Sequence, residues 1–201
     1  ASSQIQVREQ VVSQNEDRRE ETETEMMNEL VKTCPVVDGC LNIYQGDIAE
    51  TGVNIGFQTC NDSLDQVRRV IWAAKSKGMK ILDWWDKKHL HVDSYRYGIV
   101  IYSQKHPPVR GDAATVRTWA DAGIGVLGLA WHRSDQNQEE TERLGGSDDQ
   151  FWGLTRLGRD VIRQCEDHGI IVDVSHCNRR TLLQTCRMAN KPVLCTHANP
   201  W

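Results

Sequence analysis

Two strand-like runs that each end in a histidine place the strongest constraint on how this chain folds. The first run covers residues 170–176 and the second residues 192–197, and a helix-like segment, residues 179–189, lies between them. A strand, a crossover helix and a second parallel strand bring both strand ends to the same edge of one sheet. Because neighbouring strands lie about 4.8 Å apart, the imidazoles of His176 and His197 can share one metal ion.

The rest of the chain repeats this alternation from residue 36 onward. The other predicted strands are residues 36–38, 52–57, 99–102 and 126–130, and the other predicted helices are residues 64–77, 113–122 and 154–168. The helical spacing of apolar residues and a closing glycine support the helices, whereas residues 79–92 are ambiguous. Continuous apolar strands interleaved with amphipathic helices predict a parallel sheet that is buried on both faces.

Six strand–helix units are too few to close a (β/α)8 barrel, which takes about 250 residues. An open, doubly wound sheet would tolerate six strands. We nevertheless predict an α/β fold of the (β/α)8 TIM-type barrel kind, truncated to about six units, because polar residues gather where the predicted strands end. The chain begins without Met and stops soon after the second histidine, so we expect a fragment.

The first residues form a separate compositional zone. Residues 15–25 are almost entirely charged or Thr, which is typical of a solvated helix or a disordered arm. We therefore predict a polar N-terminal arm over residues 1–33 and a partial barrel over residues 34–201.

Composition excludes several classes of function. The net charge of −4 and the lack of a basic stripe argue against a nucleic-acid partner, and no apolar run reaches the length of a membrane span. The seven cysteines are scattered without paired spacing, which favours a reduced, cytoplasmic setting over a disulfide scaffold. No phosphate loop or nucleotide fingerprint is present.

Polar and soft side chains follow the predicted strands at several places. They are Cys40, Asn42, Gln104, Trp131 and His132, in addition to the two histidines. Imidazole and thiolate are good zinc ligands, whereas the neutral amides of Asn and Gln are weak ones. Each residue also has a plain structural interpretation: a hydrogen-bonded core histidine, a buried thiol or a structural amide.

Three segments resemble motifs of the membrane (renal-type) dipeptidases. These segments are G-L-T-x-L-G-R (residues 153–159 with Arg156 as x), G-I-I-V-D-V-S-H (residues 169–176) and K-P-V-L-C-T-H-A-N (residues 191–199). Residues 36–39, V-V-D-G, resemble the opening of the first strand of that family. The similarity is strongest over the last fifty residues and weaker before residue 98. The resemblance implies a (β/α)8 barrel, zinc and hydrolysis of dipeptides.

The resemblance also implies roles for particular residues. In that family a glutamate bridges two zinc ions, a His and an Asp of the first strand bind one ion, and the histidines of strands five and six bind the other. His176 and His197 match the second pair. Cys40 stands at the position of the first-strand His, Asn42 at that of the Asp, and Gln104 at that of the bridging Glu.

The fourth-strand catalytic His of the family aligns with Trp131, and His132 is adjacent. We expect Trp131 and Asn199 to line a substrate pocket and keep His132 as a catalytic candidate. A proton-handling Asp on strand eight would lie beyond residue 201. Residues 102–104 and 196–200 are similar to a divergent branch of the family that carries comparable replacements.

The replacements decide the expected metal content. Two zinc ions held close together need negative ligands, and replacing Asp and Glu by Asn and Gln removes that charge. We therefore expect one zinc ion rather than two, in a dipeptidase-like metallohydrolase impaired by these replacements and by truncation. The alternative is a non-catalytic protein that binds a small molecule on the same scaffold. Homodimerisation is left open.

Overall fold

The computed structural model describes residues 22, 25, 37–41, 54–60, 63–82, 98–104, 111–131, 143–147 and 150–198. The chain divides into two compact units, residues 1–36 and 37–201. In the first unit the described residues are Thr22 and Glu25, both helical and exposed. No helix among the described residues is long and apolar enough to cross a membrane.

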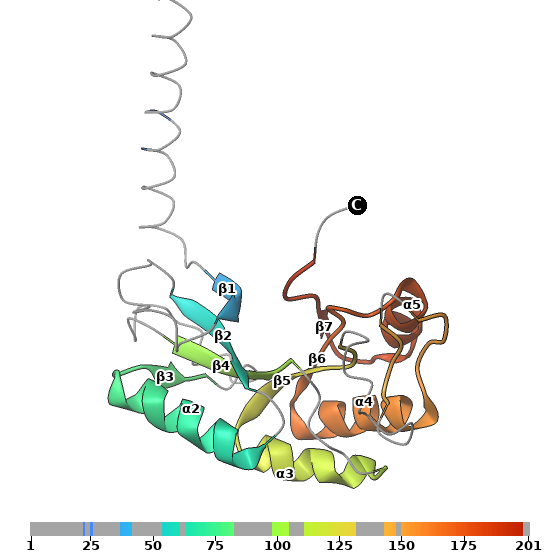
Figure 1. Ribbon diagram of the computed structural model, residues 1–201, viewed down its shortest axis with the longest axis horizontal. Coiled ribbons are helices and arrows are strands. Elements are labelled where there is room, and N and C mark those ends of the chain that lie inside the picture. The colour runs from blue at the N-terminus through green and yellow to red at the C-terminus, as the bar shows by residue number, and fades with distance from the viewer. Residues whose placement is uncertain are drawn as a thin grey trace, which may run out of the picture. The chain divides into compact units, whose positions relative to one another are not determined.

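Strands and helices alternate along the second unit (Figure 1). The strands are β1 (Val37–Leu41), β2 (Ile55–Cys60), β3 (Lys80–Ile81), β4 (Gly98–Ser103), β5 (Ile124–Gly128), β6 (Ile171–Asp173) and β7 (Val193–Leu194). The helices are α2 (Leu64–Ser76), the short 3-10 helix η5 (Ala113–Thr115), α3 (Val116–Asp121), α4 (Arg156–His168) and α5 (Arg179–Met188). Each predicted helix is present, although the one predicted over residues 113–122 is divided into η5 and α3.

All strand pairs are parallel, and the spatial order is β1-β2-β4-β5-β6-β7. This order follows the chain without a reversal, whereas the strand order of a doubly wound sheet reverses at its switch point. β3 pairs with the start of β4 and is a seventh strand that the sequence did not predict, because it occupies two residues of the ambiguous segment 79–92.

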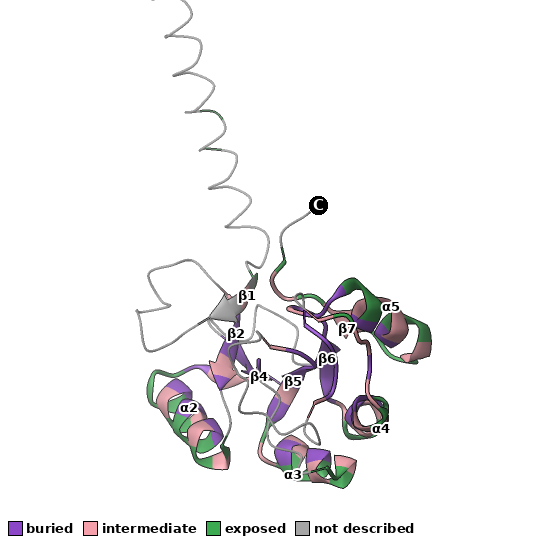
Figure 2. Ribbon diagram, turned by 45° about the vertical axis from the view of Figure 1, so that its right-hand side comes forward, coloured by how far each residue is buried: buried purple, intermediate pink, exposed green. Residues whose placement is uncertain are grey.

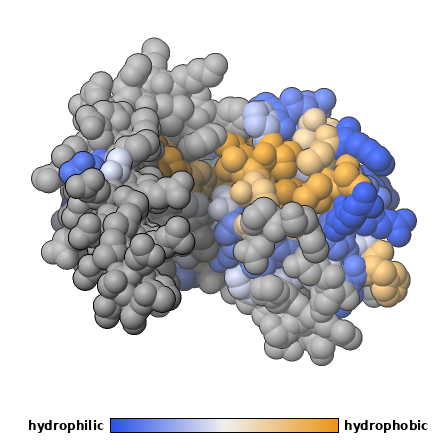
Figure 3. Space-filling view, turned by 90° about the horizontal axis from the view of Figure 1, so that it is seen from above, coloured by the Kyte–Doolittle hydropathy of each residue, from blue (hydrophilic) through white to orange (hydrophobic). Residues whose placement is uncertain are grey.

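The sheet has apolar side chains on both faces, as expected for buried parallel strands. In β4, Ile99 and Ile101 pack with the helices, whereas Val100 and Tyr102 belong to an inner cluster with Ile55, Phe57, Leu82, Val126 and Ile171. The helices lie around the outer side of the strands, with buried residues on the sides that face the sheet (Figure 2). Viewed from the side opposite α2, α3 and α4, apolar residues gather beside a hydrophilic margin (Figure 3).

The two histidine runs form shorter strands than predicted. β6 ends at Asp173 and β7 ends at Leu194, so each histidine follows its strand by three residues. The reason is that side chains replace the backbone partners at this edge. The Thr196 N–H donates to the Asp173 carboxylate (2.9 Å) and the His197 N–H donates to Ser175 Oγ (3.2 Å).

The G-L-T-x-L-G-R motif builds the start of α4. Thr155 is the N-cap, and its hydroxyl accepts a hydrogen bond from the Gly158 N–H at 2.9 Å. The same hydroxyl donates to the Arg143 carbonyl at 2.6 Å, which ties the helix to the preceding loop. Gly158 is buried against the backbone of Leu144, and an added Cβ would overlap the Leu144 carbonyl oxygen. The glycine is therefore required by a close backbone contact.

This contact reverses the usual effect of a glycine-to-alanine change in a helix. In an open helix the change stabilises by about 1 kcal/mol. Because the new methyl would overlap backbone atoms, we expect Gly158→Ala to lower the free energy of unfolding by about 1–3 kcal/mol, measured by urea unfolding. Arg159→Ala, at an exposed position of the same helix, is the control and should change stability by about 0.5 kcal/mol or less. If Gly158→Ala were as stable as the parent or more stable, this would contradict the close contact between Gly158 and the Leu144 backbone.

Glu166, near the end of α4, holds the turn that leads into β7. Its carboxylate accepts hydrogen bonds from the backbone N–H groups of Asn190 (2.5 Å) and Lys191 (3.0 Å) and from the Asn190 side chain (3.1 Å). Burial raises the pKa of Glu166, but the hydrogen bonds from Asn190 and Lys191 and the charge of Lys191 outweigh burial, so the pKa lies below its ordinary value. The ionised form is therefore the one that holds the turn.

The lowered pKa makes this stabilisation depend on pH. A carboxylate with a lowered folded pKa stabilises the fold above its unfolded value of about 4.3 and loses that contribution as the pH falls through the folded pKa. We expect Glu166→Gln to be less stable than the parent at neutral pH, with a difference that shrinks below about pH 4, measured by urea unfolding across pH. Asp167→Asn, an exposed neighbour, is the control. A difference for Glu166→Gln that is constant across pH would contradict the assignment.

Candidate functional site

The strand register brings distant residues to one edge of the sheet. Gly128 of β5 pairs with Asp173 of β6, and Asp173 pairs with Leu194 of β7. Trp131, His176 and His197 each follow one of these paired residues by three positions. The carboxyl ends of β5, β6 and β7 therefore deliver one indole and two imidazoles to neighbouring places, as the sequence predicted for parallel strands.

Gln104 joins them from the next strand. It follows β4 directly, and a Cβ added at Gly128 would overlap the Gln104 carbonyl oxygen, so the two backbones are in close contact. Its side-chain Nε2 lies 2.9 Å from His197 Nε2 and 3.3 Å from His176 Nε2. The side chain is largely buried, with 9 % exposed, while both histidines are half-buried. The amide is thus more deeply buried than the two imidazoles that it contacts.

The two imidazoles meet through their Nε2 atoms, which lie 2.7 Å apart. Each unprotonated ring nitrogen presents a lone pair, and two bare lone pairs at this distance repel. Either the N–H of one ring is therefore donated to the lone pair of the other, or a cation is bound between them. The ring centroids are 4.7 Å apart with an interplanar angle of 69°, so the rings converge edge-to-face on one point.

Two aromatic side chains border the imidazoles. The Trp131 indole lies edge-to-face on His176 with ring centroids 4.5 Å apart, and Tyr102 lies edge-to-face with His197 at 6.5 Å. Such contacts fix the planes of the imidazole rings. Trp131 therefore contacts His176 directly.

His176 has an unusual backbone conformation. Its φ of 64° lies in the left-handed region, which costs free energy for a residue other than glycine and is found mostly at functional sites. The turn is held by the Cys177 N–H, which donates to the Val174 carbonyl at 3.1 Å, and by the Asn178 N–H, which donates to the Gly146 carbonyl at 2.9 Å. The surrounding chain thus imposes this conformation on the histidine.

Asn178 extends this support to the loop before α4. Its side-chain Nδ2 donates to the carbonyls of Gln150 (2.7 Å) and Trp152 (2.8 Å), and its Oδ1 caps α5 through the Thr181 N–H (2.8 Å). One buried amide therefore joins the His176 turn, the loop and the start of α5.

Sequence reasoning missed the network beneath the imidazoles. Asp173 is fully buried, and its carboxylate accepts hydrogen bonds from the Tyr102 hydroxyl (2.5 Å), the Ser175 hydroxyl (3.1 Å) and the Thr196 N–H (2.9 Å). Ser175 is also buried, and its Oγ lies 3.2 Å from Thr196 Oγ1. The signal was present in the sequence, because an acidic residue within a continuous apolar strand needs buried donors.

The remaining predicted site residues lie wholly or partly outside the residues that the structure describes. Cys40 lies in β1, but its side chain is outside the described part of the structure, as are Asn42, His132 and Asn199. β1 does reach the site, because a Cβ added at the preceding Gly39 would overlap the Thr196 carbonyl oxygen. Among the described residues no group of three or more His, Cys, Asp or Glu side chains could hold a metal ion.

The spacing of the two imidazoles is close to that of two nitrogen ligands on one zinc ion. Two zinc–nitrogen bonds of about 2.05 Å at a tetrahedral angle separate the nitrogens by about 3.3 Å, so the two Nε2 atoms would have to move apart by only about 0.6 Å. Imidazole is a good zinc ligand, whereas the Gln104 amide faces both rings through its Nε2 nitrogen and adds no charge. The described residues fit one ion with two nitrogen ligands, and they include no carboxylate that could bridge a second ion.

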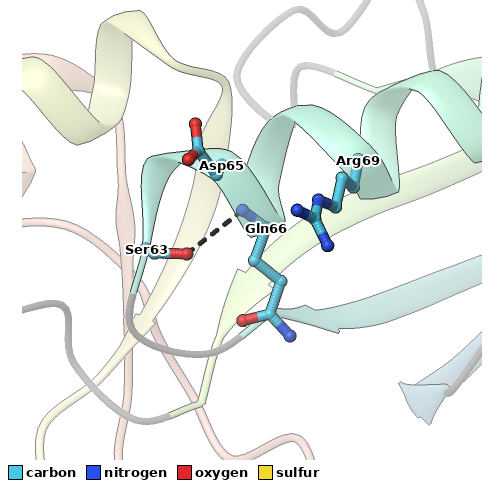
Figure 4. A pocket seen from close by; sticks show the side chains of 4 residues that line it. All are labelled: Ser63, Asp65, Gln66 and Arg69. Carbon is cyan, nitrogen blue, oxygen red and sulfur yellow. Dashed lines mark hydrogen bonds between the residues drawn. The ribbon is translucent and has the colours of Figure 1, made fainter.

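A surface pocket of about 550 Å³ lies at the start of α2, lined by Ser63, Asp65, Gln66 and Arg69 (Figure 4). Ser63 is the N-cap, and its hydroxyl accepts the Gln66 N–H at 3.2 Å. The pocket thus follows the end of β2, and its described lining residues include none of the predicted site residues.

Solved structures with a similar fold include an amidohydrolase and a metallo peptidase. An amidohydrolase from Pseudomonas aeruginosa superimposes with a TM-score of 0.69 and 17% identity over 83% of this chain and 53% of its own length. A metallo peptidase from Rhodobacter sphaeroides, solved with a phosphinate mimic of the dipeptide L-Ala-D-Ala, gives 0.64 and 17% over 82% of this chain and 65% of its own. These matches show that the chain shares the α/β fold of these two proteins, with its parallel sheet.

Sequence comparison identifies the family. An uncharacterized protein from Acinetobacter calcoaceticus is 24% identical over 144 residues, 71% of this chain and 45% of its own length. The chain therefore spans about half the length of the Acinetobacter protein and of the Pseudomonas amidohydrolase. The model of the membrane dipeptidase family, peptidase family M19, matches residues 3–201. Because this match covers almost the whole sequence, the chain belongs to the membrane dipeptidase family, as its strand-end motifs predicted.

Proposed function

We propose that the site binds one zinc ion through His176 and His197 and that the complete protein hydrolyses the peptide or amide bond of a small substrate such as a dipeptide. The observation that carries this proposal is the pair of Nε2 atoms 2.7 Å apart, which converge on one point where a single cation could be bound. Membership of a metallodipeptidase family supports it.

Zinc bound at such a site lowers the pKa of a bound water and polarises a carbonyl group. The chain itself supplies orientation and shelter. His176 is held in a strained turn, His197 is held by the Asp173 network, and Trp131 packs edge-to-face against His176. We assign Trp131, together with Asn199, to the substrate pocket.

The replaced ligands set the metal count. Gln104 is neutral and touches both imidazoles, so it adds no negative charge that would hold a second cation nearby. We therefore propose one zinc ion, with Cys40 and Asn42 as weaker candidates for a further contact. His132 stays a candidate catalytic residue.

The same neutrality favours a second candidate function, a small-molecule-binding protein without catalysis. A single weakly held ion, or none, would leave a pocket bordered by Trp131, Gln104 and the imidazoles. A dipeptide would then bind without being cleaved. A cytoplasmic location and a homodimer stay predictions from the sequence.

Zinc content separates the metal site from a purely structural histidine pair. We expect about one zinc per chain, measured by elemental mass spectrometry after exhaustive dialysis, and about a tenfold or greater loss in His176→Ala and in His197→Ala, because each substitution removes one of the two nitrogen ligands. His168→Ala removes an exposed histidine at the end of α4 and should keep the parent's zinc.

Either of two results would overturn the metal site: no zinc in the folded parent, or unchanged zinc in His176→Ala. A dipeptide assay on the zinc-loaded protein then separates the two candidate functions. Cleavage supports the hydrolase, whereas saturable binding of an intact dipeptide supports the binding protein.

Restoring a charged side chain at position 104 should strengthen the site. Gln104 contacts both imidazoles, so Gln104→Glu places a carboxylate where a cation would be bound. We expect zinc affinity to rise about tenfold or more, measured by competition with a chelating dye. Gln164→Glu, which adds the same charge on α4, is the control and should leave the affinity unchanged. A weaker or unchanged affinity in Gln104→Glu would place the cation elsewhere.

A further inference from the structure

The two ring nitrogens of His197 face different surroundings. Nε2 is directed into the site, towards Gln104 and His176, whereas Nδ1 lies 2.9 Å from Thr196 Oγ1. In a neutral imidazole one nitrogen carries the proton and the other presents a lone pair, and the hydrogen-bond partners decide which. Only a nitrogen with a free lone pair can bind a metal ion. The hydrogen-bond partner of Nδ1 therefore influences whether Nε2 has a lone pair available for a metal ion.

The donor and the acceptor in each hydrogen bond follow from the protons that each group carries, beginning with Asp173. The carboxylate only accepts, so Ser175 Oγ donates its single proton to Asp173 at 3.1 Å. Ser175 Oγ is then left as an acceptor, and it accepts the His197 backbone N–H at 3.2 Å. Its 3.2 Å contact with Thr196 Oγ1 must use the threonine proton. Thr196 Oγ1 in turn can only accept from His197, which places the proton on Nδ1.

The opposite direction is less favourable. It would require Thr196 to donate to Nδ1 and Ser175 to donate to Thr196, so the buried carboxylate would lose a charge-assisted hydrogen bond, which is about twice as strong as a neutral one. The other neighbour of Ser175 Oγ, the Cys195 sulfur, lies 3.9 Å away and is a weak acceptor.

The other side of the ring gives independent support. The Gln104 Nε2 group is a donor and lies 2.9 Å from His197 Nε2. A donor at this distance needs a lone pair on Nε2, which agrees with a proton on Nδ1. Contacts on the two sides of the ring thus specify the same tautomer.

We propose that Asp173, Ser175 and Thr196 form a hydrogen-bond relay that keeps the proton of His197 on Nδ1 and directs the Nε2 lone pair into the site. The three residues are positioning residues, because none of them lies at the point where the imidazoles meet. The relay acts through two hydroxyl groups from a carboxylate that is fully buried, whereas a carboxylate commonly contacts a metal-binding histidine directly. The tautomer is a property of the chain alone, while its use in metal binding rests on the proposed function.

Nitrogen-15 NMR of histidine-labelled, metal-free protein tests the relay, at a pH where the imidazole is neutral. The parent should show His197 protonated at Nδ1. Ser175→Ala frees the Thr196 hydroxyl to donate to Nδ1, so the proton should move to Nε2. Thr196→Val removes the acceptor and should reduce the Nδ1 form, whereas Thr196→Ser keeps a hydroxyl and should restore the parent spectrum. Thr196→Val is nearly isosteric, and circular dichroism would verify its fold.

A parent ring protonated at Nε2, or an Nδ1 form that persists in Ser175→Ala and Thr196→Val, would overturn the relay. Zinc titration of the same proteins is the second readout, with an expected loss of about tenfold to a hundredfold in Ser175→Ala and Thr196→Val and little change in Thr196→Ser. If the tautomer behaves as proposed and the parent binds no zinc, the proposed function fails while the relay stands.

Discussion

The buried carboxylate of Asp173 is the interaction on which the arrangement of the site depends. It is fully buried and accepts hydrogen bonds from β4 through Tyr102, from its own turn through Ser175 and from the end of β7 through the Thr196 N–H. A buried charge without such donors would be very costly. The three donors therefore have to be in place, and this requirement holds the ends of β4, β6 and β7 in register.

The same requirement explains why the last two strands are short. The backbone N–H groups of Thr196 and His197 bond to side chains of Asp173 and Ser175 instead of continuing the ladder. The chain turns away from the sheet at this point and carries each histidine beyond the strand end. An amide, Asn178, then holds the turn that follows His176. Polar side chains thus convert two regular strands into a pair of converging imidazoles.

The chemistry available at this edge depends on Gln104 and Trp131, two uncharged side chains that contact the imidazoles. Gln104 touches both imidazoles but brings no negative charge, and Trp131 packs against His176 where the family resemblance implies a histidine. A site of this kind favours one cation at most among the described residues. The geometry still concentrates the hydrogen-bonding capacity of two rings and an amide on a single point, which suits both a metal ion and a polar ligand.

The sequence by itself determined the alternation of strands and helices, the helix positions and the meeting of His176, His197, Gln104 and Trp131, because apolar periodicity and parallel winding are local rules. It placed the histidines within strands, since nothing in the run of apolar residues shows where the backbone ladder stops. Only the tertiary structure decided this, because the partners of Asp173 come from Tyr102 and Thr196, residues 71 and 23 positions away. The direction of protons around His197 is likewise set by contacts between strands, which no local pattern encodes.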